Sequence, residues 1–218
     1  MESSITSIIT EIENRQENLV PDFSGISALV AGLGGIGNWI AVDLALIGTG
    51  TLILFDPDKV EPSNLNRTLF RLSDIGKYKT KAVKELIMER RKDMIVITGE
   101  EYFTVEHLKK KITGVDYIFD CTDSTKLMNS IAGALKRNEK FILPPYVKLG
   151  YDGFEGTLCI NDFESGRWGQ DSGYVTVPSF FGTPQILSAA GIIELMLNKN
   201  PSKIVNLNVK KLITQISN

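Results

Sequence analysis

The sequence predicts a doubly wound α/β domain, built on a mainly parallel sheet with a short antiparallel extension. Three observations predict it. Apolar runs alternate with amphipathic stretches through the first two thirds of the chain, which is typical of repeated β–α units. A glycine-rich turn joins the first apolar run to the first amphipathic stretch. A segment with the pattern of a β-hairpin then follows residue 145.

The expected elements follow in order from the N-terminus. A polar segment with isoleucines at helical spacing predicts a helix over 1–20, which we expect to dock on the domain because a lone helix is marginally stable in water. Uninterrupted apolar runs predict strands that are covered on both faces. The expected strands are 26–31, 51–55, 94–98, 115–120 and 140–143, and the expected helices are 36–47, 78–92, 104–112 and 124–137.

The pattern changes after Pro144 and Pro145. Residues 161–182 show no regular period and predict a long crossover-type loop, and a loop of this length in a compact domain is usually functional. The remaining expected elements are the hairpin strands 146–149 and 156–160, the helix 184–197 and the strand 204–209.

Length and composition limit the classes of protein. A chain of 218 residues suits one α/β domain, so we predict a single domain over 1–218, with 1–24 as docking helix and linker. The net charge of −2 implies no general affinity for nucleic acid or for an anionic membrane. No apolar run is long enough to cross a bilayer, and the N-terminus lacks the pattern of a signal peptide. We therefore expect a cytoplasmic protein.

The cysteine content excludes one kind of metal site, and the one histidine has the pattern of a surface residue. Cys121 and Cys159 lie far apart without CxxC spacing, which excludes a cysteine zinc site within one chain. The one histidine, His107, lies in a segment with the pattern of a surface helix, so we interpret it as a solvated side chain.

The glycine-rich turn over residues 32–37 predicts a nucleotide site. Backbone N–H groups of such a turn approach a phosphate, and the helix that follows adds its dipole. Asp56 ends the next strand, where an acidic side chain accepts hydrogen bonds from ribose hydroxyls. This Rossmann-like arrangement does not distinguish NAD from ATP, and the alternative is a turn used only for close packing. The glycines expected to bind the cofactor are Gly32, Gly34, Gly35 and Gly37.

Four further motifs, in order, resemble the ThiF/MoeB/HesA family of the ubiquitin-activating adenylyltransferase superfamily. Residues 56–67 resemble its D-x-D-x-V-x-x-S-N-L-x-R stretch, and residues 74–82 resemble its D-I/V-G-x-x-K-x-x-x-A helix start. Residues 120–123 read D-C-T-D, as in the family, and residues 181–184 resemble its late proline-containing helix start. The resemblance covers about residues 25–200.

This resemblance implies Mg²⁺-assisted, ATP-dependent adenylation of a carboxylate, usually the C-terminal glycine of a ubiquitin-like or sulfur-carrier protein. Such chemistry brings two anions together, so cations should dominate catalysis. Lys79 matches the family's phosphate-facing lysine, and Arg67 matches an arginine that reaches in from the other subunit of a dimer. A homodimer is therefore expected, with ATP as the cofactor and with no nucleic acid or membrane as partner.

Three further residues carry roles that the resemblance implies. Asn64 matches a polar group near the phosphates, and Asp58 lies near the phosphate end of the site. Asp123 matches the aspartate associated with Mg²⁺, a cation that prefers carboxylate and phosphate oxygens. Asp123 is thus the expected metal residue, and Arg67, Lys79 and Asp123 form the expected catalytic set.

Each assignment has an alternative. Asn64 is also suited to cap a turn, Asp123 to cap a helix, and Arg67 and Lys79 to lie solvated on the surface. Lys77 and Lys81 flank Lys79, although the motif spacing favours Lys79. A further arginine–glutamine pair, Arg15 and Gln16, corresponds to a family pair before the first strand, where the arginine contacts phosphate, but its spacing is shorter.

The chain also departs from the family pattern. It lacks the two CxxC pairs that bind zinc in many members, and residues 161–182 contain no cysteine. Cys121 and Cys159 read as buried side chains, so we predict adenylation without a thioester on the enzyme. Aromatic residues of the loop either cover the site or pack on the domain's own core; they are Trp168, Tyr174, Phe180 and Phe181.

Three other functions remain as alternatives. The first is adenylation of a peptide carboxylate or of a carboxylate on an RNA base. The second is a non-catalytic module that binds a nucleotide and a partner. The third is an NAD-dependent dehydrogenase, which ranks last because His107 is badly placed for acid–base chemistry.

Overall fold

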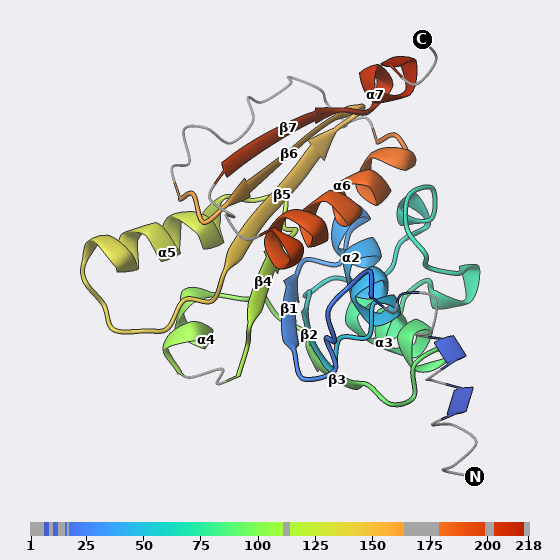
Figure 1. The fold of residues 1–218 in the computed structure, drawn as a ribbon, viewed down its shortest axis with the longest axis horizontal. Helices are drawn as coiled ribbons and strands as arrows, with labels where there is room; N and C mark the ends of the chain where they lie inside the picture. Colours follow the sequence, from blue (N-terminus) through green and yellow to red (C-terminus); the bar gives the residue numbers. More distant parts are fainter. Residues whose placement is uncertain are drawn as a thin grey trace.

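The fold centres on a seven-stranded sheet with the strand order β3-β2-β1-β4-β5-β6-β7 (Figure 1). A computed structural model of the chain describes residues 7–8, 11–12, 16, 18–110, 114–163, 179–198 and 203–215. Strands β1 to β5 pair in parallel, whereas β6 and β7 are antiparallel to their neighbours. The predicted fold class is therefore confirmed. The strands are β1 (Ser27–Ala31), β2 (Thr51–Phe55), β3 (Ile95–Gly99), β4 (Tyr117–Asp120), β5 (Tyr146–Asp152), β6 (Glu155–Ile160) and β7 (Lys203–Asn208).

Helices cover both faces of this sheet (Figure 1). One face carries α2 (Gly35–Leu46), α3 (Lys79–Met88) and α6 (Gly182–Ile192), and the other carries α4 (Val105–Lys109) and α5 (Lys126–Lys136). The remaining elements are two 3₁₀ turns, η2 (Pro62–Asn64) and η3 (Leu72–Asp74), a π-helical turn η5 (Ile193–Leu197) and the terminal α7 (Val209–Gln215), which the sequence did not predict. The strand order reverses direction between β1 and β4, which is where doubly wound folds bind their ligands.

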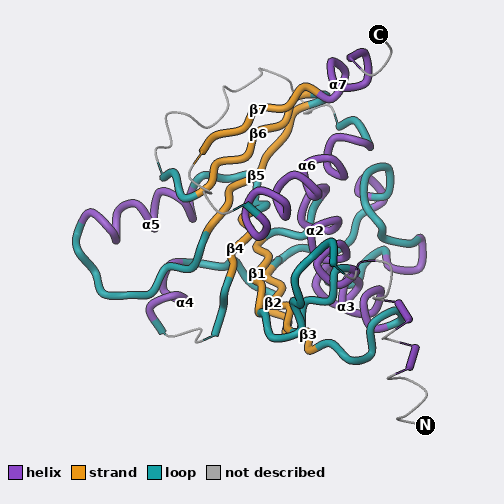
Figure 2. The backbone as a smooth tube through the Cα atoms, viewed as in Figure 1, coloured by secondary structure: helices purple, strands orange, loops and turns teal. Residues whose placement is uncertain are grey.

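The predicted strand over 140–143 is wrong. Figure 2 shows a loop between α5 and β5, and Ile142 in it is 87% exposed. Pro144 and Pro145 have no N–H group to donate to a neighbouring strand, so pairing begins with the Pro145 carbonyl, which accepts from the Ile118 N–H at 2.9 Å. Strand β5 alone takes the place of two predicted strands: it pairs in parallel with β4 and forms the hairpin with β6.

Two apolar clusters hold these layers together. The larger lies between the sheet and α2, α3 and α6, and it includes Val30, Ile40 and Leu187. The smaller lies between the sheet and α4 and α5, and it includes Leu29 and Ile131. Because successive residues of β1 alternate between the two clusters, this central strand is buried on both faces, as its uninterrupted apolar run predicts.

Two predicted segments lie largely outside the described residues. Within the predicted N-terminal helix, residues 7–8 and 11–12 are helical, and Gln16 donates to the Leu46 carbonyl at the C-terminal end of α2, while Arg15 is not among the described residues. Of the predicted loop, only its two ends are described, so the predictions for Trp168 and Tyr174 lie outside the described residues.

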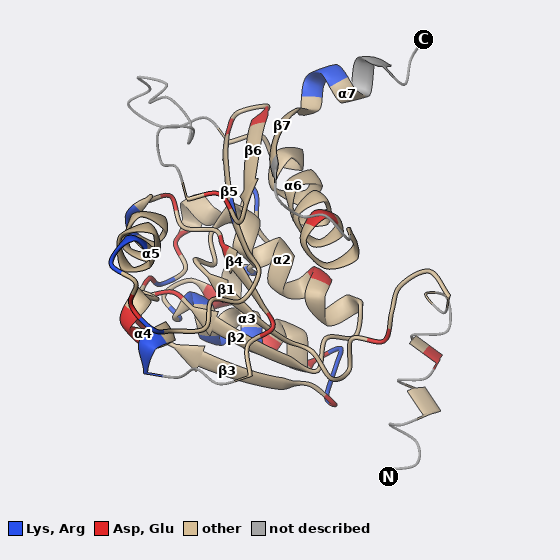
Figure 3. Ribbon diagram, turned by 60° about the vertical axis from the view of Figure 1, so that its left-hand side comes forward, with Lys and Arg blue, Asp and Glu red and all other residues tan. Residues whose placement is uncertain are grey.

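The described surface mixes both signs of charge. In the ribbon of Figure 3, both acidic and basic positions occur along α4, α5 and the neighbouring loops. No helix within the described ranges is long and apolar enough to cross a membrane.

His107 has a structural role rather than the solvated one we expected. Its ring stacks on Phe103 with centroids 5.4 Å apart and meets the edge of Phe55 at 5.1 Å. Its Nδ1 also accepts the Thr104 N–H at 3.1 Å, which caps the start of α4. The side chain thus fixes α4 against the end of β2.

The packing of α2 against α6 predicts a pH dependence of stability. The half-buried Asp43 carboxylate accepts the Ser188 hydroxyl at 2.6 Å, and burial raises the pKa of Asp43 above its ordinary value of 3.8. As pH rises above that value, the unfolded chain ionises first, so this group lowers the free energy of unfolding. We expect the melting temperature of Asp43→Asn to gain on the wild type as pH rises from about 4 to 7.

Asp93 provides the control of opposite sign. Its hydrogen bonds to Arg91 lower the pKa of Asp93, so its stabilising contribution is present at neutral pH and is lost as pH falls. Asp93→Asn should therefore fall below the wild type at neutral pH and approach it in acid. The prediction would be contradicted if the difference in melting temperature between the wild type and Asp43→Asn stayed constant across this pH range.

Candidate functional site

The glycine-rich turn connects the end of β1 to α2. Gly32 has φ of +83°, a conformation that favours glycine, and a Cβ at Gly37 would overlap the Gly32 carbonyl oxygen. Gly34 is the N-cap residue of α2, and within the described chain no side chain caps this helix. The first N–H groups of a 12-residue helix therefore point outward at the carboxyl end of the sheet, where they suit an anion.

Asp56 joins the end of β2 to this turn. Its carboxylate accepts the Leu33 N–H at 2.6 Å and the Asp58 N–H at 2.8 Å, and the residue is 4% exposed. Burial raises the pKa of Asp56, while the neighbouring Lys79 ammonium opposes that rise. Each carboxylate oxygen retains a lone pair beyond these bonds, so the arrangement is compatible with the predicted ribose contact.

Lys79 is the lysine that meets these carboxylates. Its Nζ lies 2.8 Å from Asp58 Oδ2 and 3.8 Å from Asp56 Oδ1, and its side chain is 11% exposed. The two flanking lysines pair elsewhere, Lys77 with Asp74 and Glu85 and Lys81 with Glu100. Helix α3 begins at Lys79, so the helix start directs this one ammonium towards the end of β2.

Asn64 and Arg67 lie in the segment that follows. Asn64 is buried, and its side-chain oxygen accepts the Glu61 N–H at 3.0 Å, which is the turn-capping alternative. Arg67 donates to the Ser63 carbonyl at 2.6 Å and to Asn66 at 2.9 Å, both in its own segment. This segment packs on the first turns of α2, because Trp39 donates to the Arg67 carbonyl at 3.0 Å.

The turn after β4, residues 120–123, forms the other side of the candidate site. A Cβ at Gly32 would lie 2.9 Å from the Thr122 nitrogen, so this turn packs directly on the glycine-rich turn. Asp123 is exposed there, and no side-chain bond holds it within the described ranges. The glycine turn, Asp56 and Lys79 are thus joined by contacts, and the turn of Asp123 touches the same glycines.

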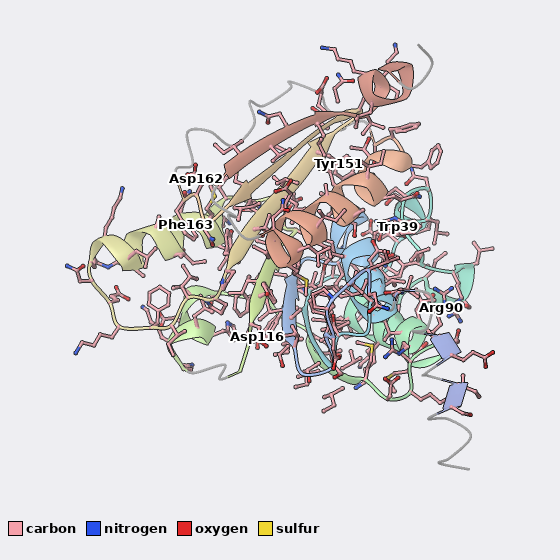
Figure 4. All side chains as sticks on the ribbon, viewed as in Figure 1. Trp39, Arg90, Asp116, Tyr151, Asp162 and Phe163 are labelled. Carbon is pink, nitrogen blue, oxygen red and sulfur yellow. The ribbon has the colours of Figure 1, made fainter. Side chains whose placement is uncertain are left out.

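Two residues of β5 near this side of the site were not predicted from the sequence. Tyr151 of β5 places its hydroxyl 2.6 Å from where a Cβ of Gly35 would lie, and 2.5 Å from the Ser179 hydroxyl; Figure 4 shows Tyr151 beside α6. Lys148, also of β5, is fully buried against Asp120. A signal for Lys148 existed, since it is a charged residue inside an apolar run of the predicted hairpin.

The residues present fit ATP and Mg²⁺. The uncapped helix start and the Lys79 ammonium offer cationic partners to phosphates, and a Cβ at Gly34 would meet no atom within 4 Å, which leaves space over the turn. Within the described ranges no three acidic, cysteine or histidine side chains cluster as a metal site. Mg²⁺ usually binds one or two carboxylates together with phosphates and water, so a single exposed Asp123 suits it.

Neither cysteine is placed for covalent catalysis. Cys159 is 3% exposed in β6, as predicted, but Cys121 is only partly buried, because it lies in the turn after β4 and not in the core. Desolvation, reinforced by the Asp120 carboxylate, nevertheless raises the pKa of the Cys121 thiol far above its usual range. We expect the native protein to resist iodoacetamide at pH 7.5 and both thiols to react after unfolding, as measured by mass spectrometry. Rapid alkylation of Cys121 in the folded protein would contradict this.

Known proteins resemble this chain. A profile of the ThiF family matches residues 11–168. The sulfur carrier protein ThiS adenylyltransferase of Escherichia coli (strain K12) is 32% identical over 133 residues, which are 61% of this chain and 51% of that protein. The tRNA threonylcarbamoyladenosine dehydratase of Haemophilus influenzae is 33% identical over 112 residues, which are 50% of this chain and 43% of that protein.

The fold also has solved counterparts. The crystal structure of E. coli MccB with MccA-N7isoASN matches with a TM-score of 0.67 and 21% identity, over 86% of this chain and 65% of that one. The chain spans about half the length of the curated relatives described above. Because the matched segment 11–168 makes up well over half of the 218 residues, this chain belongs to the ThiF family.

Proposed function

We propose that this protein adenylates a carboxylate with ATP, and that its substrate is the C-terminal glycine of a ubiquitin-like or sulfur-carrier protein. The observation that carries the proposal is the contact chain from Lys79 through Asp56 to the uncapped turn before α2. It brings the Lys79 ammonium to the same end of the sheet as the uncapped N–H groups of a helix start, and both features suit the phosphates of a nucleotide. The likeness to the ThiS adenylyltransferase supports the choice of substrate class.

In the proposed reaction, a carboxylate oxygen of the substrate attacks the α-phosphorus of ATP. The bond from that phosphorus to the bridging oxygen breaks, and pyrophosphate leaves while an acyl-adenylate remains. Lys79 neutralises charge on the phosphates, Asn64 and Asp58 border them, and Asp56 binds the ribose. Mg²⁺ at Asp123 would neutralise the leaving pyrophosphate. The acyl group then passes to an external nucleophile, because Cys159 is buried and the pKa of the Cys121 thiol is strongly raised.

ATP–pyrophosphate exchange tests this function. We expect exchange with a small carrier protein that ends in Gly-Gly, and none with the same carrier lacking its last glycine. If none of the carboxylate substrates tested supports exchange and the protein binds NAD tightly, the proposal is overturned. Tight ATP binding without exchange would instead favour the non-catalytic module.

A second substrate class has its own support. The chain is similar to a protein named as a tRNA threonylcarbamoyladenosine dehydratase, so a carboxylate on an RNA base is the alternative substrate. The exchange assay distinguishes the two when threonylcarbamoyl-modified tRNA replaces the carrier. Exchange that depends on this tRNA and not on the carrier would select the alternative.

We further propose a cytoplasmic homodimer in which Arg67 completes the site of the other subunit. Its guanidinium bonds to its own segment, which leaves its remaining N–H groups for a phosphate across an interface. Arg67→Ala and Lys79→Ala should each be inactive alone. Mixed and re-associated, they should recover about a quarter of the wild-type exchange rate, because half the dimers carry one intact site. No recovery in proven mixed dimers would place Arg67 in its own subunit's site or outside both.

A further inference from the structure

A buried ion pair supports the turn after β4, residues 120–123, at the candidate site. Lys148 and Asp120 are register partners on the adjacent strands β5 and β4, and both are 0% exposed. Lys148 Nζ lies 3.1 Å from Asp120 Oδ1. Burying two charges is strongly unfavourable unless further hydrogen bonds satisfy them, so such a pair in a sheet core calls for a reason.

The ammonium of Lys148 is directed at the turn that follows β4. It donates to the Thr122 carbonyl oxygen and, at 3.0 Å, to the Thr122 hydroxyl oxygen. Asp120 holds the same residue, because its Oδ1 accepts the Thr122 N–H at 3.1 Å and the Thr122 hydroxyl at 2.7 Å. The pair therefore fixes the backbone of Thr122 from both sides.

Tyr146 completes this cluster. It lies two residues before Lys148 on the same face of β5, and its hydroxyl donates to Asp120 Oδ2 at 2.5 Å. Burial and the Asp120 carboxylate raise the pKa of Tyr146, so the hydroxyl keeps its proton and remains a donor. The carboxylate is thus satisfied on both oxygens, which makes the cluster a rigid one.

The turn held in this way touches the glycine-rich turn and carries Asp123. A Cβ at Gly32 would meet the Thr122 nitrogen at 2.9 Å and the Cys121 carbonyl atoms at 3.0 Å, so a shift of the turn would move the glycines. Asp123 directly follows Thr122, and its own side chain is exposed. The orientation of Asp123 therefore depends on the backbone of Thr122.

We propose that Lys148 is a positioning residue for the nucleotide site: its ammonium locks the turn over residues 120–123, and so fixes Asp123 towards Mg²⁺ and the glycine turn towards the phosphates. This rests on the proposed function. Lys148 itself touches neither substrate nor metal.

The test uses the double variant Asp120→Asn with Lys148→Met. It removes both buried charges and keeps the volume and the turn-capping oxygen, so the fold should persist. Hydrogen exchange without nucleotide should be about tenfold faster than in wild type at the amides of Cys121 and Thr122, which donate to the Ala31 carbonyl and to Asp120 Oδ1. The Mg²⁺ concentration for half-maximal binding of a fluorescent ATP analogue should rise about tenfold or more.

Arg91→Met is the matched control. Arg91 is also buried and pairs with Asp93, but it donates to the Ala45 carbonyl near the C-terminal end of α2, away from the glycine turn. It should lower stability without changing the Mg²⁺ requirement. Thr122→Val, which removes the hydroxyl but no charge, should give the same changes as the double variant to a smaller extent, and it serves if the double variant does not fold.

The outcomes separate this inference from the proposed function. Unchanged amide exchange and an unchanged Mg²⁺ requirement in the folded double variant would overturn the positioning role of Lys148 and would leave the proposed function standing. A wild type that binds no Mg·ATP would overturn the proposed function and the role of Lys148 in it, whatever the amides show.

Discussion

Replacing Lys79 with methionine is expected to lower the rate of ATP–pyrophosphate exchange by about two to three orders of magnitude and to leave the fold intact. The side chain is 11% exposed and its ammonium lies 2.8 Å from Asp58, so it is held at the site before any nucleotide arrives. Methionine has similar length and flexibility but no charge. Of its two carboxylate partners, Asp58 is 62% exposed at its side chain and stays hydrated, whereas the buried Asp56 loses a neighbouring charge but keeps its hydrogen bonds from the Leu33 and Asp58 N–H groups, so some stability should be lost while the fold persists.

Lys81→Met is the matched control for this prediction. Lys81 lies two residues further along α3, its side chain is 58% exposed, and it pairs with Glu100 on the surface. We expect its exchange rate to stay within about twofold of wild type, since exposed ion pairs contribute little. Equal losses in both variants, or no loss in Lys79→Met, would show that Lys79 is not the phosphate-facing cation.

Replacing Gly37 with alanine is expected to lower the melting temperature by about 10 °C or to prevent folding. A Cβ there would overlap the Gly32 carbonyl oxygen and would also lie 3.1 Å from Cys121 Cβ. Both neighbours are held, one by the backbone of the turn and one by the turn after β4, so neither can move cheaply. Any folded protein should bind ATP weakly, because relief of the overlap displaces the N-terminal end of α2. Thermal unfolding and nucleotide titration measure the two effects.

Gly133→Ala is the control for the effect of a methyl group alone. Gly133 lies within α5, and a Cβ there would meet the flexible Arg137 guanidinium at 3.1 Å. Alanine favours a helix over glycine by up to about 1 kcal/mol, so stability should be unchanged or slightly higher and ATP binding should be unaffected. A melting temperature of Gly37→Ala equal to wild type would show that the turn relaxes at no cost.

The sequence predicted the strands and helices around the glycine turn because their patterns are local. The apolar run of β1, the glycines after it and the amphipathic α2 each reflect burial along a short segment. The strand predicted at 140–143 failed because periodicity does not show where pairing begins. Two prolines without N–H groups moved the start of pairing to Tyr146.

The candidate site was predictable in residue type and only partly in contacts. Asp56, Lys79 and the glycines of residues 32–37 lie together at the ends of β1 and β2, as the motif order implies. Asn64 caps its own turn in the structure, and its role at the phosphates stays a prediction, as do those of Arg67 and Asp123. An alternative assignment that the sequence left open, Lys77 or Lys81 in place of Lys79, is disfavoured by the ion pairs of those two lysines.

The sequence by itself determined the family, the order of the elements and the presence of a glycine turn at a helix start, because each depends on residues close together in the chain. Only the tertiary structure decided which lysine contacts Asp56 and which buried ion pair holds the turn that carries Asp123. Lys148 and Asp120 are 28 residues apart, and they meet because β4 and β5 pair in one register, with Asp120 opposite Lys148. A one-residue slip would place their side chains on opposite faces of the sheet, so this contact depends on strand register, which no local pattern specifies.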